Sequence, residues 1–311
     1  MNNGVSRVLV LGGFGFIGSH LCRGLLSSGY QVRALGRKNS KRVLLNDILD
    51  DIEIFEGDIG SADEMLHAMR DIDIVVHAVH TTVPQSSMRN PAYDICSNVA
   101  LPITWISCLN ETSVKKIIYI SSGGTVYGIP QLDMISEDHP TNPICSYGVT
   151  KLMNEKYLSM YAGFFGIKCI IVRPSNIYGF GQRLDKEQGV IGTLLNRALL
   201  QKTLEIWGDG SSLRDYLYID DAISGLLKLL QCNDVEGVFN MSSGVGHSVL
   251  EIVSLLQSYL GQELDIKHVP WHKHDTPVNI LNSSKLMDTV DWLPKISLYS
   301  GIGLLVEALT A

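Results

Sequence analysis

The residues most suited to chemistry form two groups, one near the N-terminus and one near the middle of the chain. Gly12, Gly13, Gly15 and Gly18 directly follow a short apolar run. Glycines at such spacing let the backbone turn tightly and approach a pyrophosphate closely. The second group is Tyr147-Gly148-Val149-Thr150-Lys151, in which a phenol and an ammonium lie one helical turn apart. This pair is suited to moving a proton, because a nearby cation favours the ionised phenol.

The glycine group predicts a dinucleotide site. It fits both G-x-G-x-x-G and G-x-x-G-x-x-G, and it lies between a predicted strand, Arg7–Leu11, and a predicted helix, Ile17–Ser28. The free N–H groups and the dipole at a helix N-terminus favour an anion, so the pyrophosphate is expected there. The residues expected to contact the cofactor here are Gly12, Gly15, Phe16, Ile17 and Gly18.

The end of the second predicted strand, Gln31–Leu35, bears on the choice between NAD and NADP. An acidic residue usually stands there to bind the ribose hydroxyls, but this chain has Gly36 followed by Arg37 and Lys38. The two cations suit a 2′-phosphate, which favours NADP. The alternative is that both belong to a solvated loop, which leaves NAD open. Further expected cofactor contacts are Asp58, to the adenine amino group, Ile59 and Ala78.

Tyr147 is the expected base and acid, and Lys151 is expected to lower its pKa and to hold the nicotinamide ribose. His77 and His80 end the fourth predicted strand. A wall of the pocket is the favoured interpretation for both, and proton transfer is the alternative.

Strands and helices alternate through the first half of the chain, which predicts a doubly wound parallel sheet covered on both faces. Ligands of such sheets bind at the carboxyl ends of the strands, where these candidate residues lie. After Pro174 the pattern loosens into short strands, helices and glycine-rich turns, which predicts a smaller α+β domain. The expected elements are strands at 7–11, 31–35, 52–56, 74–77, 116–121, 167–173, 204–207, 237–241 and 266–269, and helices at 17–28, 61–69, 93–110, 146–165, 190–201, 221–230 and 249–260.

Seven short motifs along the chain together indicate a family. They are the glycine group, Gly57-Asp58-Ile59, Ser121–Gly128, Ser146–Lys151, Arg173–Gly179, Trp207–Gly210 and Arg214-Asp215-Tyr216. With these motifs the chain resembles the extended short-chain dehydrogenase/reductase family, in its branch of nucleotide-sugar epimerases, dehydratases and 4-keto reductases. The resemblance implies a Rossmann domain at 1–174, with return segments near 215–243, and a mainly nucleotide-sugar-binding domain at 175–311. It also implies a nucleoside-diphospho-sugar substrate held by Thr81, Asn176, Arg214 and His272.

The chain departs from the family pattern at three places. Gly123 stands where the family has its catalytic serine or threonine, so Ser122 or Thr125 would have to supply that hydroxyl. His272, followed by Lys273, stands where an arginine usually binds the diphosphate. Gly124 and Thr125 replace the Asp-Glu pair of the dehydratases, which disfavours dehydration.

Three functions remain open at this point. The first is 4-epimerisation of a nucleoside-diphospho-hexose through a 4-keto intermediate. The second is an NADPH-dependent reductase of 4-keto-6-deoxysugar nucleotides, which the cations after Gly36 favour. The third is a dinucleotide-sensing protein without turnover, and the intact pair of Tyr147 and Lys151 counts against it.

Composition limits the partners. The net charge of −7 without a block of like charge disfavours nucleic acid and membrane surfaces as partners. The six scattered cysteines and the absence of a signal-peptide pattern predict a cytoplasmic protein without a metal site. The family resemblance implies a homodimer formed through the helices at 93–110 and 146–165.

Overall fold

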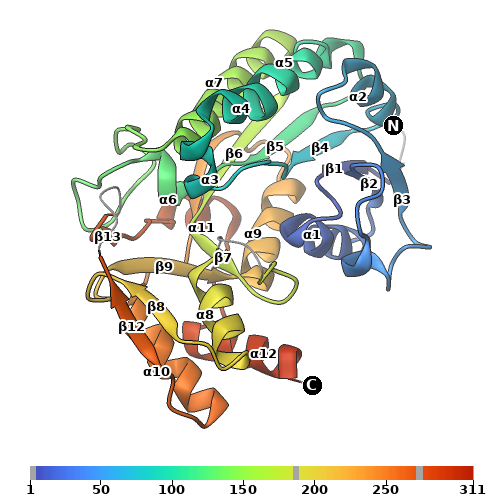
Figure 1. Ribbon diagram of the computed structural model, residues 1–311. Helices are drawn as coiled ribbons and strands as arrows, with labels where there is room; N and C mark the ends of the chain where they lie inside the picture. Colours follow the sequence, from blue (N-terminus) through green and yellow to red (C-terminus); the bar gives the residue numbers. More distant parts are fainter. Residues whose placement is uncertain (1–4, 185–188, 271–275, 311) are drawn as a thin grey trace. The chain divides into compact units, whose positions relative to one another are not determined.

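The apolar runs of the first half form a seven-stranded sheet in the computed structural model, which describes residues 5–184, 189–270 and 276–310 (Figure 1). Its strands are β1 (Arg7–Leu11), β2 (Gln31–Gly36), β3 (Glu53–Glu56), β4 (Ile74–His77), β5 (Lys116–Ile120), β6 (Lys168–Pro174) and β10 (Gly237–Met241). They lie in the order β10-β6-β5-β4-β1-β2-β3, and the neighbours from β3 to β6 pair in parallel. The predicted doubly wound parallel sheet is confirmed.

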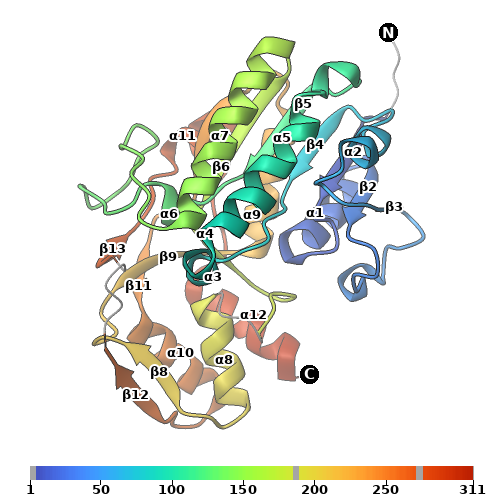
Figure 2. The same cartoon turned by 45° about the horizontal axis from the view of Figure 1, so that its top comes forward.

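Helices cover both faces of this sheet (Figure 2). One face carries α1 (Phe16–Ser27) and the part of α9 (Ile219–Gln231) from Ile223 on, and Gly24 of α1 lies against Ile223. The other face carries α2 (Ala62–Ala68), α5 (Leu101–Ile106) and α7 (Ser146–Phe165). On that face Leu9 and Leu11 of β1 share a fully buried cluster with Trp105 of α5 and Leu158 of α7. Burial of these side chains stabilises the layers, at about 1.5–3 kcal/mol for a leucine.

The helical stretch predicted at 93–110 is confirmed as far as Ile106, although it is not a uniform α-helix. α4 (Pro91–Ile95) continues through a π turn at Cys96–Ala100 into α5, and a short 3₁₀ turn follows at Leu109–Glu111. Pro102 explains part of the π turn, because proline has no N–H to donate to the carbonyl of Asn98. That carbonyl instead accepts a hydrogen bond of 2.8 Å from the side-chain amide of Asn154 in α7.

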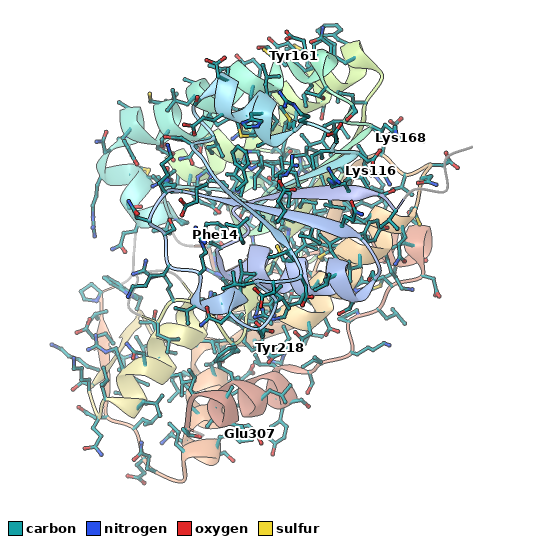
Figure 3. The ribbon with its side chains drawn as sticks, turned by 90° about the vertical axis from the view of Figure 1, so that its right-hand side faces the viewer. Phe14, Lys116, Tyr161, Lys168, Tyr218 and Glu307 are labelled. Atoms are coloured by element: carbon teal, nitrogen blue, oxygen red, sulfur yellow. The ribbon has the colours of Figure 1, made fainter. Side chains whose placement is uncertain are left out.

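A buried lysine fixes the end of α9 to the sheet. Lys116 of β5 is 5% exposed, and its ammonium donates to the carbonyls of Leu230 and Cys232, at 2.8 Å each. A cation at the C-terminus of a helix satisfies carbonyls that lack a partner within the helix. Figure 3 labels Lys116 and Lys168, which are paired neighbours on β5 and β6.

The chain divides into two compact units. The first contains the chain through Ser122, Cys145–Arg173 and Ile223–Phe239, and the second contains Gly123–Ile144, Pro174–Ala222 and the chain from Asn240 on. Besides the elements already given, the first unit holds α3 (Pro84–Arg89) and a 3₁₀ turn at Val43–Leu45. The predicted assignment of one domain to the cofactor and one to the substrate stays a prediction.

The second unit is built around β9 (Leu213–Tyr218), which pairs with three short strands. These are β7 (Asn176–Tyr178), β11 (Gly246–Ser248) and β13 (Val278–Asn279), and a separate pair joins β8 (Leu204–Trp207) to β12 (Ile266–Val269). Its helices are α6 (Gly123–Val126), α8 (Val190–Leu199), α10 (Val249–Leu260), α11 (Ser284–Val290) and α12 (Leu298–Thr310). Among the described residues, no helix combines the length and the apolar character that crossing a membrane requires.

Candidate active site

The turn between β1 and α1 fits the pyrophosphate of a dinucleotide. Gly12 has a φ of +83°, a conformation that favours glycine. A side chain at Gly18 would overlap the carbonyl oxygen of Gly12, so the helix can lie this close to the turn only with glycine there. Gly15 caps α1 without a side-chain hydrogen bond, and the first turn, which begins with Phe16 and Ile17, holds no acidic residue. The helix N-terminus is therefore available to an anion.

Phe14 occupies the space in which a carboxylate would stand after β2. A Cβ added at Gly36 would overlap the Phe14 ring, which is labelled in Figure 3. The guanidinium of Arg42 lies over the same ring, 5.3 Å from its centroid. Arg37 and Lys38 are both exposed, and the Lys38 ammonium lies 3.8 Å from a Glu64 carboxylate oxygen. This strand end therefore carries cations, and the Phe14 ring lies where an acidic side chain would begin.

The other expected cofactor residues lie at neighbouring strand ends of the same unit. Asp58 follows β3, and its carboxylate accepts a hydrogen bond of 2.9 Å from the backbone of Gly60. Ile59 is buried beside the sheet. The backbone N–H of Ala78 donates to the carbonyl of Leu11 at 3.0 Å, which keeps the segment after β4 beside the glycine turn.

Tyr147 and Lys151 lie together on the buried side of α7, with exposed fractions of 9% and 4%. The Lys151 ammonium lies 5.6 Å from the centroid of the Tyr147 ring and 5.0 Å from that of Tyr119. It donates a hydrogen bond of 2.8 Å to the carbonyl of Ile120 at the end of β5. The structure thus brings the predicted phenol and ammonium to the carboxyl end of the sheet.

Burial sets the charge states of this pair. It raises the pKa of Tyr147 well above the usual range, and a hydrogen bond with Ser122 opposes that shift. Burial lowers the pKa of Lys151 from 10.5 to about 7, while the carboxylates of Glu155 and Asp94 raise it. The hydrogen bond with Ser122 lowers the pKa of Tyr147, and the expectation that Lys151 also lowers it stays a prediction.

The two candidate hydroxyls differ in their surroundings. Ser122 follows β5 in the first unit and hydrogen-bonds to the Tyr147 phenol. Thr125 belongs to α6 in the second unit, and its buried hydroxyl has no hydrogen-bond partner among the described residues. Of the two, Ser122 is the one that the structure brings to the phenol.

His77, the last residue of β4, and His80, which follows the strand, have buried side chains and are uncharged at neutral pH. The ring centroids of His80 and Tyr147 are 4.4 Å apart, in an edge-to-face arrangement, and those of His77 and Tyr119 are 5.2 Å apart. Burial and the charge of Lys151 lower the pKa of His80 to about 4 and that of His77 to about 3. Both rings therefore form walls around the pair of Tyr147 and Lys151.

Sequence reasoning missed two buried carboxylates beside this pair. Glu155, one turn after Lys151, is ion-paired with Arg173 at 2.6 Å and accepts a hydrogen bond from Ser121. Asp94 of α4 is fully buried and accepts from the Ser146 hydroxyl at 2.7 Å. A signal for Glu155 existed, because the polar residues of this helix recur with helical spacing and therefore share one face. The residues of that face are Tyr147, Thr150, Lys151, Asn154 and Glu155, all of which are buried.

The four residues expected to bind the substrate lie in different settings. Thr81, in the first unit, already hydrogen-bonds to Ser97 and to Asn98, at 2.8 and 3.1 Å. Asn176 is exposed on β7, and its amide donates to the carbonyl of Asp215 at 2.8 Å. Arg214 lies on β9, the strand with which β7 pairs. These two therefore share one sheet of the second unit, whereas His272 lies outside the described residues.

Comparisons with known proteins show similarity over most of the chain. The profile of the NAD dependent epimerase/dehydratase family matches residues 8–242. A dTDP-4-dehydro-6-deoxyglucose reductase of Escherichia coli is 34% identical over 239 residues, which cover 76% of this chain and 75% of the relative. The crystal structure of UDP-glucose 4-epimerase from Thermotoga maritima with UDP-glucose has a TM-score of 0.91 and 31% identity, and the match covers 98% of each chain.

A second solved structure holds the cofactor. The UDP-glucose 4-epimerase of Thermus thermophilus in complex with NAD matches with a TM-score of 0.90 and 28% identity, covering 98% of this chain and 99% of the other. The match of the family profile spans most of the chain, including both the glycine turn and the pair of Tyr147 and Lys151. The chain therefore belongs to the NAD dependent epimerase/dehydratase family.

Proposed function

We propose that this protein is a nucleotide-sugar 4-epimerase, which inverts C4 of a nucleoside-diphospho-hexose through a 4-keto intermediate. The observation that carries the proposal is the buried contact of the Tyr147 phenol with Lys151 and Ser122, in the same unit as the glycine turn. The epimerases of Thermotoga maritima and Thermus thermophilus match over nearly the whole chain. The nicotinamide, when bound, supplies the acceptor and donor of the C4 hydride.

The proton steps fall to the residues of α7. Tyr147 takes the proton of the C4 hydroxyl as the alcohol is oxidised, and it returns a proton when the ketone is reduced on its opposite face. Ser122 hydrogen-bonds to the phenol and stabilises its ionised form. Lys151 holds the nicotinamide ribose, and its positive charge favours the phenolate in the assembled site.

The second candidate is an NADPH-dependent 4-keto reductase that uses the same proton donor. The exposed pair Arg37 and Lys38, with Phe14 filling the acid's place at Gly36, favours a 2′-phosphate and hence NADP over NAD. The reductase of Escherichia coli supports this alternative by its similarity. An epimerase regenerates its cofactor in each cycle, so a preference for NADP gains it nothing.

Incubation with UDP-glucose or UDP-galactose, without added cofactor, separates the candidates. Interconversion of the two sugars supports the epimerase, whereas NADPH oxidation that depends on a 4-keto-6-deoxysugar nucleotide supports the reductase.

In either case Tyr147→Phe is expected to lower kcat by at least about 100-fold, because proton transfer is lost. The dinucleotide that the variant retains is measured after it is released by denaturation.

Tyr157→Phe on the same helix is the matched control and is expected to keep full turnover. Retained activity in Tyr147→Phe would remove the role assigned to the phenol. A wild-type protein that binds the dinucleotide but converts neither class of sugar would favour the third possibility, a sensor without turnover.

The substrate contacts remain part of the proposal. Asn176 and Arg214 are proposed to bind the diphosphate from one sheet of the second unit, as their positions in the family pattern imply. Thr81 is proposed to contact the sugar, and His272 to supply the missing arginine's hydrogen bond to phosphate.

The assembly and the compartment are also proposed. A homodimer formed through α7, α4 and α5 is supported by large apolar side chains that these helices expose. They are Tyr93, Ile95, Leu101, Val149, Met160 and Phe164.

A cytoplasmic location is supported by six free cysteines, since reducing compartments keep thiols unpaired.

A further inference from the structure

We propose that Asp94 is a positioning residue for Tyr147 and Lys151: it fixes the first turn of α7, and its buried charge sets the pH range of proton transfer. The inference rests on the proposed function, since it concerns the same proton donor. Asp94 lies on α4, a helix of five residues that itself contributes no group to the cofactor or the substrate in the proposal above.

The contacts of Asp94 hold the start of α7. One carboxylate oxygen accepts from the hydroxyls of Ser146 and Thr150, at 2.7 and 3.3 Å, and these residues directly precede Tyr147 and Lys151. The other oxygen accepts from the hydroxyl of Thr82 and, at 2.8 Å, from the amide of Asn98. The carboxylate thus joins the segment after β4 to the turn of α7 that carries the phenol.

His80 lies between this carboxylate and the phenol. Its Nε2 is 3.6 Å from an oxygen of Asp94, and its ring meets the Tyr147 ring at 4.4 Å and an interplanar angle of 69°. The His80 side chain is 8% exposed. An uncharged imidazole in this position restrains the phenol by packing and leaves the negative charge of Asp94 unneutralised.

Asp94 stays ionised throughout the range in which the enzyme would work. Burial opposes its ionisation, but the nearby His80 ring and the hydroxyls of Thr82 and Ser146 lower the pKa of Asp94 to about 2. Its charge raises the pKa of Tyr147 and of Lys151. Other titratable and charged groups surround the pair, and they come from every element packed against it. They are His77 of β4, His80 after β4, Asp94 of α4, Tyr119 of β5, Arg173 of β6, Cys145 before α7 and Glu155 of α7.

The sign of the effect follows from these charges. A negative charge disfavours the phenolate of Tyr147 and favours the ammonium of Lys151, so it moves both ionisations to higher pH. The rate depends on the protonation of both the phenol and the ammonium, so the two limbs of the rate profile follow the pKa values of these two groups. Removing the charge moves both limbs to lower pH.

Asp94→Asn, which keeps the shape of the side chain, tests the proposal. Both limbs of the kcat profile are expected to move to lower pH, by on the order of one pH unit. An NMR titration of isotope-labelled lysine, with the Lys151 signal assigned by its loss in Lys151→Met, is expected to show the same downward shift without any turnover. Thr82→Val is the matched control, because it removes one hydrogen bond to Asp94 but keeps the charge of Asp94. Both limbs of its kcat profile are expected to stay at the pH of the wild type.

Unchanged limbs and an unchanged Lys151 titration in a folded Asp94→Asn protein would overturn the inference. Equal shifts in Thr82→Val would also overturn it, since they would show that any loosening of the network has this effect. If the wild-type protein converts no nucleotide sugar, the proposed function fails by itself. The Lys151 titration then decides the present inference separately.

Discussion

Lys151 shows how one residue is placed for chemistry at a cost to folding. Its ammonium is held by a single carbonyl and two aromatic faces, and burial lowers its pKa to about 7. An ion in such surroundings lacks the hydration that an exposed lysine has. Lysines of this kind are usual at sites that move protons, and their replacement often stabilises the protein while it removes function.

Lys151→Met is therefore expected to unfold at a higher temperature than the wild type near neutral pH. The pKa of this lysine falls from 10.5 to about 7 on folding, so between these values the unfolded chain binds more protons. Wild-type stability then rises with pH across that window, because the folded lysine loses its charge. The advantage of the variant is full below about pH 7 and decreases toward pH 10.5.

Thermal unfolding across that pH range measures the difference. Lys115→Met is the control, because the Lys115 side chain is 77% exposed and its replacement is expected to give a small change without this pH dependence. A Lys151→Met protein that melts below the wild type near neutral pH would contradict the prediction.

At the scale of elements, α7 carries a polar face into the interior. Its buried residues include Asn154, which bonds to the π turn, and Glu155, which bonds to β6 through Arg173. The helix is thus held in register by specific polar contacts besides apolar packing. Glu155 and Arg173 form a buried ion pair, and breaking such a pair by removing one of its charges is strongly destabilising.

Glu155→Gln is expected to lower the free energy of unfolding by about 3–5 kcal/mol, because it removes the charge of one partner from the buried ion pair with Arg173. Denaturant unfolding measures the loss. Asp234→Asn is the control: the Asp234 side chain is fully exposed in its pair with Lys168, so its replacement is expected to change nothing measurable. A loss for Glu155→Gln no larger than that of the control would contradict this view of α7.

Sequence patterns predicted the elements whose signals are local. The bounds predicted for the strands at Arg7–Leu11, Ile74–His77 and Leu204–Trp207 agree with the structure. The sequence patterns missed β9, since its polar residues, among them Arg214, give no apolar alternation. They also missed the π turn at Cys96–Ala100, where the carbonyl of Asn98 accepts a hydrogen bond from Asn154 on a helix far along the chain.

The same reasoning applies to the site. The glycine turn and the pair of Tyr147 and Lys151 are short motifs, and each is recognisable within one element. Asp94 is not, because an aspartate on a short helix usually faces solvent, and only tertiary packing shows that this one is fully buried. The raised pKa of Tyr147 could not be foreseen either, since it depends on burial among several elements.

At the scale of the whole molecule, the apolar side chains exposed on α7 bear on assembly. Phe164 is 74% exposed and Met160, one turn earlier, is 42% exposed. If these side chains lie within the proposed dimer interface, Phe164→Glu is expected to convert the protein to monomers in sedimentation experiments, because it buries an unpaired charge. Ile129→Glu is the control at a comparably exposed apolar residue (64%) of the second unit. A wild-type monomer, or a Phe164→Glu dimer of unchanged affinity, would contradict the proposed interface.

The ring of Phe14 constrains how this lineage can change its nucleotide preference. An acidic side chain at Gly36 would overlap the ring, so the ring has to move or to be replaced by a smaller side chain. Its replacement also removes the aromatic face beneath Arg42. A change of Gly36 to an acid is therefore expected to work best together with a change at Phe14, and engineers who attempt the conversion should combine the two.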